Sequence, residues 1–276
     1  MSLATLRSSI ETALAGRVPS PFTYRDRKIV ETIPAGIPEI DSLTGGLPRG
    51  SLTEICGSPC SGSTTLLVSA LAMRTEQSEV CALVDGRDAF DPHSAEAAGV
   101  QLKHLLWVRC RNLDQSLRAT DLLLQGGGFS MVALDLSDIP AETMRYVPLN
   151  VWFRFRRAVE DTATILLLLE RESNAKTCAS LVLRLGAESI HWKATFEAGD
   201  PQRHPFAYLL DGFQARAEVL RSRIQPAGAI SPQHNAAPTC AVNSTRKFQT
   251  NLETLFEIKT TWGYSGCGLP VEPKPK

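Results

Sequence analysis

The sequence has no excess of either charge, no long hydrophobic run and no paired cysteine motif. Lys and Arg number 29, as do Asp and Glu. No overall positive field therefore attracts nucleic acid, and DNA binding would need a local patch. No apolar run reaches the roughly 18–20 residues that cross a bilayer, and the first residues lack the hydrophobic region of a signal peptide. We therefore expect a cytoplasmic protein.

The seven cysteines are scattered along the 276 residues, and no two of them are spaced as C-x-x-C. An odd number at irregular spacing favours reduced thiols over disulfides. Because the usual pair spacing of zinc ligands is missing, no metal site is expected from the cysteines.

The composition divides the chain into three parts. Residues 1–22 hold a short amphipathic helix over 3–14 and a linker, and this helix packs either on its own domain or on a neighbouring subunit or partner. Residues 23–226 form the main domain. Residues 227–276 are rich in Ala, Pro, Asn, Gln and Thr, which predicts a disordered tail.

Four apolar residues of this tail fall on one side of a possible helical turn: Leu252, Leu255, Phe256 and Ile258. Short sets of this kind fold into a partner's groove, so they are candidate partner-binding residues. The alternative is a tail that packs back on its own domain.

From about residue 36 onward, β-rich apolar runs alternate with helical stretches. The strands are expected at 51–56, 81–85, 105–110, 131–136 and 164–169, with less regular runs near 178–185, 188–196 and 216–224. The helices are expected near 64–74, 93–99, 114–125 and 150–160. This alternation predicts an α/β fold with a doubly wound, mainly parallel sheet and flanking helices.

Residues 57–65 read GSPCSGSTT, which matches the phosphate-loop pattern G-x-x-x-x-G-K-[ST] except that Ser63 stands in the lysine position. The loop follows a predicted strand and opens a predicted helix, as the motif requires. In such loops, backbone N–H groups and the helix N-terminus surround nucleotide phosphates. Ser61, Ser63, Thr64 and the loop amides could still hold a phosphate.

Two predicted strands end in an acid near this loop. Asp135 ends the strand at 131–136, in the arrangement that holds Mg²⁺ through water in nucleotide-binding proteins, and Asp85 ends a neighbouring strand. ATP and magnesium are therefore the cofactors that the pattern suggests, and the missing lysine argues against them. The candidate residues of this degenerate nucleotide site are Gly57, Gly62, Ser63, Thr64, Thr65, Asp135, Arg221 and Arg223.

The chain resembles the ATP-binding core of the RecA family from about residue 36 to 226. Residues 45–57 (GGLPRGSLTEICG) are similar to the RecA segment that leads into its phosphate loop, and 81–92 (CALVDGRDAFDP) to the strand and turn that carry its catalytic glutamate. Residues 98–106, the strand that ends at Asp135 and the late basic strand 218–223 are also similar.

The departures from this family concern the nucleotide site. Ser63 replaces the lysine, Arg87 stands where the resemblance implies a catalytic glutamate, and Ser94 replaces a tyrosine that stacks on adenine. Arginine cannot act as a base at neutral pH, and loss of a base costs roughly 10²–10⁴ in rate. No catalytic residue is therefore expected. Within the resemblance, Arg87, or Arg221 or Arg223 of an adjacent protomer, could restore a positive charge.

The resemblance also implies two DNA-binding loops, but the matching connections, about 137–149 and 171–177, are short. The remaining basic residues interleaved with aromatics favour single-stranded DNA contacts by Arg145, Tyr146, Arg154 and Arg157. The alternative for 152–159 is a helix whose apolar face packs on the sheet.

As a whole, the pattern is similar to the ImuA-type accessory proteins, RecA-related factors of mutagenic translesion synthesis in bacteria. This resemblance implies a non-catalytic scaffold in the DNA damage (SOS) response. The partners that it implies are a polymerase-like translesion component and RecA, with self-association also possible. Two alternatives stay open: a DNA-dependent ATPase and recombinase, and a RecA-family regulator that binds ATP without turnover.

Overall fold

The computed structural model describes residues 30–86, 88–194, 208–223 and 253–259. The predicted N-terminal helix, Arg87, and the predicted tail except for 253–259 lie outside the described residues, so Leu252 lies outside them too.

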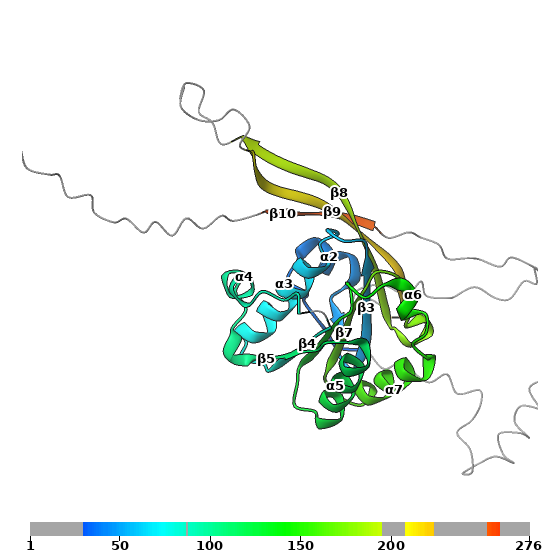
Figure 1. The fold of residues 1–276 in the computed structure, drawn as a ribbon. Helices are drawn as coiled ribbons and strands as arrows, with labels where there is room; N and C mark the ends of the chain where they lie inside the picture. The colour runs from blue at the N-terminus through cyan, green and yellow to red at the C-terminus, as the bar shows by residue number, and fades with distance from the viewer. Residues whose placement is uncertain (1–29, 87, 195–207, 224–252, 260–276) are drawn as a thin grey trace, which may run out of the picture.

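One eight-stranded sheet forms the centre of the domain, with the strand order β10-β9-β8-β3-β7-β6-β4-β5 (Figure 1). Six neighbouring strands pair in parallel, and at one edge β9 pairs antiparallel with both β8 and β10. The predicted doubly wound, mainly parallel sheet is confirmed. The strands are β3 (Ser51–Gly57), β4 (Cys81–Asp85), β5 (Leu105–Arg109), β6 (Met131–Asp135), β7 (Ile165–Glu170), β8 (Leu181–Ala194), β9 (Tyr208–Ser222) and β10 (Glu253–Lys259).

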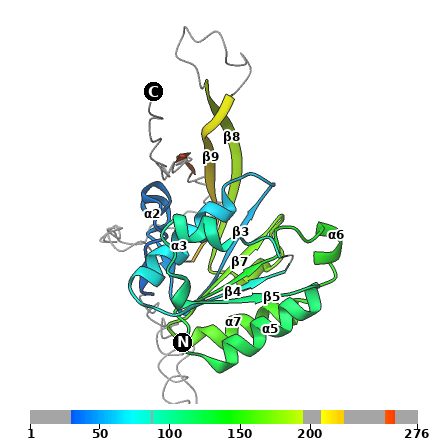
Figure 2. The same ribbon diagram turned by 60° about the vertical axis from the view of Figure 1, so that its left-hand side comes forward.

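Helices cover both faces of this sheet (Figure 2). One face carries α2 (Pro38–Thr44), α3 (Ser63–Glu76) and α4 (Pro92–Ala97), which share an apolar cluster with odd-numbered residues of β3 and β7. On the other face, α7 (Leu149–Glu160) packs on β3 and β7 and α5 (Leu113–Gly126) on β4 and β6, near α6 (Ala141–Met144). The even-numbered apolar residues of β3 and β7 belong to the apolar cluster on this face. Since the central strands are buried on both faces, β4, β6 and β7 are almost continuous apolar runs.

Side-chain caps fix where two of these helices begin. Asp91 accepts from the backbone N–H groups of His93 and Ser94 at the start of α4, and Asn112 accepts from that of Gln115 at the start of α5. Short 3₁₀ turns at η1 (Leu102–His104) and η2 (Lys176–Cys178) precede β5 and β8.

The hairpin of β8 and β9 extends beyond the body of the domain (Figure 1). The two predicted runs near 178–185 and 188–196 are one strand, whose register shifts between Ala187 and Ser189 because one extra residue is accommodated there. One face of the hairpin carries the ion pair between Glu188 and Arg216.

The predicted helical turn at 252–258 is wrong. Residues 253–259 form β10, which pairs antiparallel with β9. Phe256 is buried at 1% exposure and Ile258 packs on the same apolar cluster, whereas Leu255 is 45% exposed. In a strand, residues two apart share a face, so two of the predicted partner-binding residues are covered by the chain's own core. The predicted tail thus contains a strand of the main sheet.

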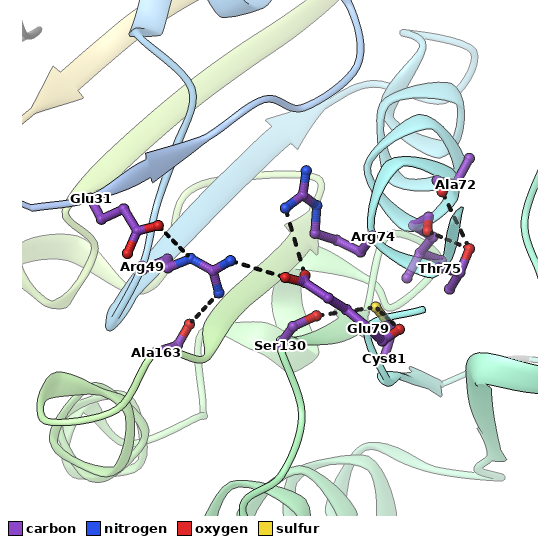
Figure 3. Close-up of polar contacts among 10 residues, drawn as sticks. Glu31, Arg49, Ala72, Arg74, Thr75, Glu79, Cys81, Ser130 and Ala163 are labelled. Atoms are coloured by element: carbon purple, nitrogen blue, oxygen red, sulfur yellow. Dashed lines mark hydrogen bonds and ion pairs between the residues drawn. The ribbon is translucent and has the colours of Figure 1, made fainter. Parts of the chain in front are cut away.

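A small ribbon of β1 (Thr32–Ile33) and β2 (Leu47–Pro48) is joined by Arg49 to the end of the sheet opposite the phosphate loop (Figure 3). The Arg49 guanidinium lies 3.4 Å from Glu31 and 3.1 Å from Glu79, and donates to the carbonyl of Ala163. Arg74, at the end of α3, lies 3.6 Å from the second oxygen of Glu79. This cluster joins three elements that are far apart in sequence.

Candidate functional site: the phosphate loop

The predicted phosphate loop connects the end of β3 to α3. Gly62 precedes the helix with φ of 91°, in the left-handed region that favours glycine, and no side chain caps the first N–H groups of α3. Ser61 is fully buried, and within the described residues its hydroxyl has no hydrogen-bond partner. The loop thus keeps a helix N-terminus with free donors, which is the feature that binds phosphate in such loops.

Strand β10 packs against this loop at Gly62. A Cβ atom on Gly62 would lie 3.0 Å from Cδ1 of Ile258 and 3.3 Å from Cζ of Phe256. At the other end of the loop, a Cβ on Gly57 would lie 2.5 Å from the carbonyl oxygen of Leu185 in β8. Both glycines therefore allow close approach of the loop to late strands, a role that the motif alone did not reveal.

Ser63, in the lysine position, is the first residue of α3 and is half-buried, while Thr64 is exposed and Thr65 half-buried. Ser63 supplies a neutral hydroxyl where the motif places a cation, and Thr64 keeps the hydroxyl that the motif requires next. Arg221, which was expected to supply the missing positive charge from an adjacent protomer, does not lie beside the loop of its own chain. Arg221 is paired with Val182, three residues before the β8 residue that is level with Gly57, and a strand rises roughly 3.3 Å per residue.

The two predicted acids lie side by side in neighbouring strands, since Asp85 in β4 is in register with Asp135 in β6. Oδ1 of Asp135 accepts from the backbone N–H of Ser137 at 3.0 Å and from its hydroxyl at 2.6 Å. Burial raises the pKa of Asp135, although the bonds from Ser137 oppose the shift. One carboxylate oxygen of Asp135 is thus already used to hold its own loop.

Asp85 organises the turn that follows β4. Its carboxylate accepts from the backbone N–H groups of Ala89 and Phe90 and from the indole N–H of Trp107. Arg109 lies over the Trp107 ring at 5.0 Å and forms an ion pair with Asp88. These aromatic and basic residues of β5 were not predicted, because nothing in their spacing marks them.

Ser94, where the resemblance implies an adenine-stacking tyrosine, donates from its hydroxyl to Asp91 at the start of α4. Arg221 donates to the backbone carbonyl of Lys176, and Arg223 is exposed. Ser94 and Arg221 therefore form hydrogen bonds within the chain that hold neighbouring segments together.

The predicted DNA-binding residues lie on α7 and on the turn before it. Trp152, Phe155 and Val159 form the buried face of α7, so the alternative interpretation of this helix is confirmed. Tyr146 is 85% exposed, and Arg157 is exposed. Arg145 lies 3.7 Å from Glu172 and Arg154 lies 2.9 Å from Asp121, so the charges of both are partly neutralised.

Two buried carboxyl groups, Glu54 and Glu170, were missed by the sequence analysis. They lie on the α7 side of β3 and β7, beneath the loop 171–177. Within the described residues, no three His, Cys, Asp or Glu side chains are grouped so as to hold a metal ion. No helix of this part of the chain is long and apolar enough to cross a membrane.

Comparison with known proteins relates the chain to the RecA-like superfamily. Residues 12–142 match the RecA N-terminal domain family. The RecA protein of Psychrobacter cryohalolentis is 37% identical over 110 residues, which cover 40% of this chain and 31% of the relative. That of Brucella anthropi is 36% identical over 108 residues, which cover 38% and 30%. The chain thus matches about a third of the length of these relatives.

The fold is similar to that in the crystal structure of the RadB recombinase, with a TM-score of 0.50 and 16% identity. The match covers 70% of this chain and 90% of the recombinase chain. The chain therefore has a RecA-like fold.

Proposed function

We propose that this chain, a relative of RecA within residues 12–142, is a non-catalytic accessory protein of the bacterial DNA damage response, similar to the ImuA-type factors of translesion synthesis. The observation that carries the proposal is Ser63, which begins α3 where the motif requires a lysine. A phosphate cation stabilises the transition state by several kcal/mol. A neutral hydroxyl does not replace that charge, so hydrolysis is the function this loop supports least.

The surroundings of the loop support the same proposal. Phe256 and Ile258 pack against Gly62, so the loop is a packing surface for β10. Asp135 is held by two hydrogen bonds from Ser137, which compete with a magnesium ion for the same oxygen. In an accessory protein, the loop serves the fold, and the function lies on other surfaces.

An accessory role also needs a surface for protein partners. In the β8–β9 hairpin, strand β8 exposes the apolar side chains of Ile190, at 56% exposure, and Trp192, at 58%. Ile190 is in register with Phe213, which is in register with Ile258, so these side chains continue the apolar face of the core. Exposed apolar surface of this kind supports protein association.

The residues present fit a lone phosphate group better than a magnesium nucleotide. The buried hydroxyl of Ser61 without a partner and the uncapped N–H groups of α3 suit phosphate oxygens. If a nucleotide binds, these donors would hold its phosphates and Asp135 would face the metal ion, which supplies charge neutralisation when present.

This fit favours one second candidate, a regulator that binds nucleotide without turnover. The test is thermal unfolding with ATP, ADP and inorganic phosphate, because a ligand that binds the folded state raises Tm by mass action. A saturable rise with ATP that exceeds the rise with phosphate would favour the regulator. Equal or absent rises favour the accessory protein.

The enzymatic alternative is tested by ATP hydrolysis with and without single-stranded DNA. We expect the wild type to hydrolyse no more ATP than Asp135→Ala, and Ser63→Lys to add ATP binding without turnover. DNA-stimulated hydrolysis that Asp135→Ala abolishes would overturn the proposal.

The role in translesion synthesis is tested by affinity purification from cells with and without DNA damage. The purification is done with the full chain and with a variant that lacks residues 260–276, because this deletion leaves β10 in place. Recovery of a lesion-bypass polymerase component supports the proposed role, and its absence from damaged cells contradicts it.

A further inference from the structure

Two glutamates are buried on the same face of neighbouring strands. Glu54 in β3 is 0% exposed and Glu170 at the end of β7 is 1% exposed. Strands β3 and β7 are parallel, and Glu170 is level with Cys56, two residues after Glu54. Since residues two apart in a strand share a face, both carboxyl groups lie on the side of the sheet that α7 covers.

The loop 171–177 is bound to these two carboxyl groups. Glu54 accepts from the hydroxyl of Ser173 at 2.8 Å and from the backbone N–H groups of Asn174 and Ala175 at 2.6 and 3.0 Å. The side-chain amide of Asn174 donates to Oε2 of Glu170 at 2.5 Å. Asn174 therefore connects both carboxyl groups, and three donors converge on Glu54, as suits an ionised carboxylate.

Glu170 differs from Glu54 in its hydrogen bonding. Within the described residues, its Oε1 atom has no hydrogen-bond partner although it is buried. An ionised carboxylate in this position would leave a charged oxygen without a donor beside a second carboxylate, which is costly in a low-dielectric interior. A proton on Glu170 removes its charge, and with it both the cost of a charged oxygen without a donor and the repulsion from Glu54.

Burial, and then the charge of Glu54, raise the pKa of Glu170 to about 8, against the opposing effect of the bonds from Asn174. The thiols of Cys56 and Cys178 face the same region, and burial raises the pKa of both. The guanidinium groups that act on these thiols from neighbouring elements are those of Arg156, Arg184 and Arg223. Their charges act on the thiols, whereas the charge that acts on Glu170 is that of Glu54.

We propose that Glu54 and Glu170 form a proton-operated latch, in which one proton on Glu170 keeps the loop 171–177 fastened to the sheet and its loss loosens the loop. Ionised Glu170 is costly beneath the closed loop beside the charge of Glu54. Opening the loop lets water reach both carboxylates, while both strands stay fixed within the sheet. The bonds from Asn174 and Ala175 to Glu54 are the ones that open.

Loosening this loop affects two other segments. Arg171 donates to the backbone carbonyl of Ser137 in the loop after β6, and Arg221 of β9 donates to the carbonyl of Lys176. Each of these two hydrogen bonds has one partner within the loop 171–177. Release of the loop 171–177 therefore also disturbs the hydrogen bonds that connect it to the loop after β6 and to β9.

The test is hydrogen exchange at the backbone amides of Asn174 and Ala175 in the full chain, corrected for the intrinsic pH dependence. In the wild type, the protection factor should fall by about tenfold or more between about pH 6 and about pH 9, as Glu170 ionises. In Glu170→Gln, which mimics the protonated carboxyl, protection should change by less than about twofold over the same range. Glu172→Gln, an exposed change in the same loop, should behave like the wild type.

Infrared spectroscopy gives an independent measurement. The band of a protonated carboxyl should disappear from the wild type between about pH 6 and about pH 9, and Glu170→Gln should lack this change. The proposal is overturned if wild-type protection at both amides is constant with pH, or if Glu170→Gln loses protection as the wild type does.

Discussion

At the scale of single residues, Gly62 combines two constraints. Its φ of 91° is unfavourable for any side chain, and its missing Cβ leaves room for Phe256 and Ile258. The first constraint is local to the loop, whereas the second depends on a strand almost 200 residues later in the sequence.

We expect Gly62→Ala to destabilise the domain by about 1–3 kcal/mol, through left-handed strain and contact with Ile258. The measurement is the free energy of unfolding in urea. Gly126→Ala is the matched control, because nothing lies within 4 Å of a Cβ there, and it should change stability by less than about 0.5 kcal/mol. Equal losses in both variants would show that Gly62 is not closely packed.

The candidate residues of the nucleotide site and the two buried glutamates differ in how far the sequence reveals them. Ser63 and Asp135 could be placed correctly because a motif fixes their position relative to a strand and a helix. Glu54 and Glu170 could not, since they are 116 positions apart in the numbering and become neighbours only through the pairing of β3 with β7. Arg221 was predicted to act on the loop of an adjacent protomer, and its register with β8 places it away from the loop of its own chain.

At the scale of the element, β10 shows that the spacing of apolar residues does not decide between helix and strand in a short segment. The sequence LETLFEI allows either a helical turn or a strand, because four apolar residues in seven fit both periods. The choice depends on the free edge of β9, which no local pattern encodes. A longer element such as α5, with 14 residues, has enough residues for the period to decide, and its ends were predicted to within one residue.

Phe256→Ala should cost about 3–5 kcal/mol of unfolding free energy, because it removes a buried aromatic ring beside the phosphate loop. Leu255→Ala, one residue earlier on the opposite face, should cost less than about 1 kcal/mol. Urea unfolding of the two variants distinguishes the strand from a helical turn. If Leu255→Ala cost as much as Phe256→Ala, the alternation of buried and exposed residues in β10 would be contradicted.

At the scale of the whole molecule, one buried carboxyl group makes folding sensitive to pH. The pKa of Glu170 is about 8 in the folded chain and near its ordinary value of 4.5 in the unfolded chain. The folded state therefore binds the proton more tightly. Stability from this group is fully present below about pH 4.5 and is lost as pH rises through about 8.

The difference in unfolding free energy between Glu170→Gln and the wild type should therefore change with pH. It should grow in favour of the variant by on the order of 3 kcal/mol between about pH 5 and about pH 9. Denaturant unfolding at several pH values measures this difference, with Glu172→Gln as the control. A constant difference across the range is the outcome that disagrees with a raised pKa.

The strand order has a consequence for synthesis of the chain. Strand β3 lies between β7 and β8, so its two neighbours span residues 165–185, more than 100 positions after β3 itself. Contacts between such distant segments form late and slow folding. A nascent chain that ends before β7 leaves both edges of β3 unpaired, with the phosphate loop attached to it. The centre of this sheet can therefore form only after the residues up to 185 have left the ribosome.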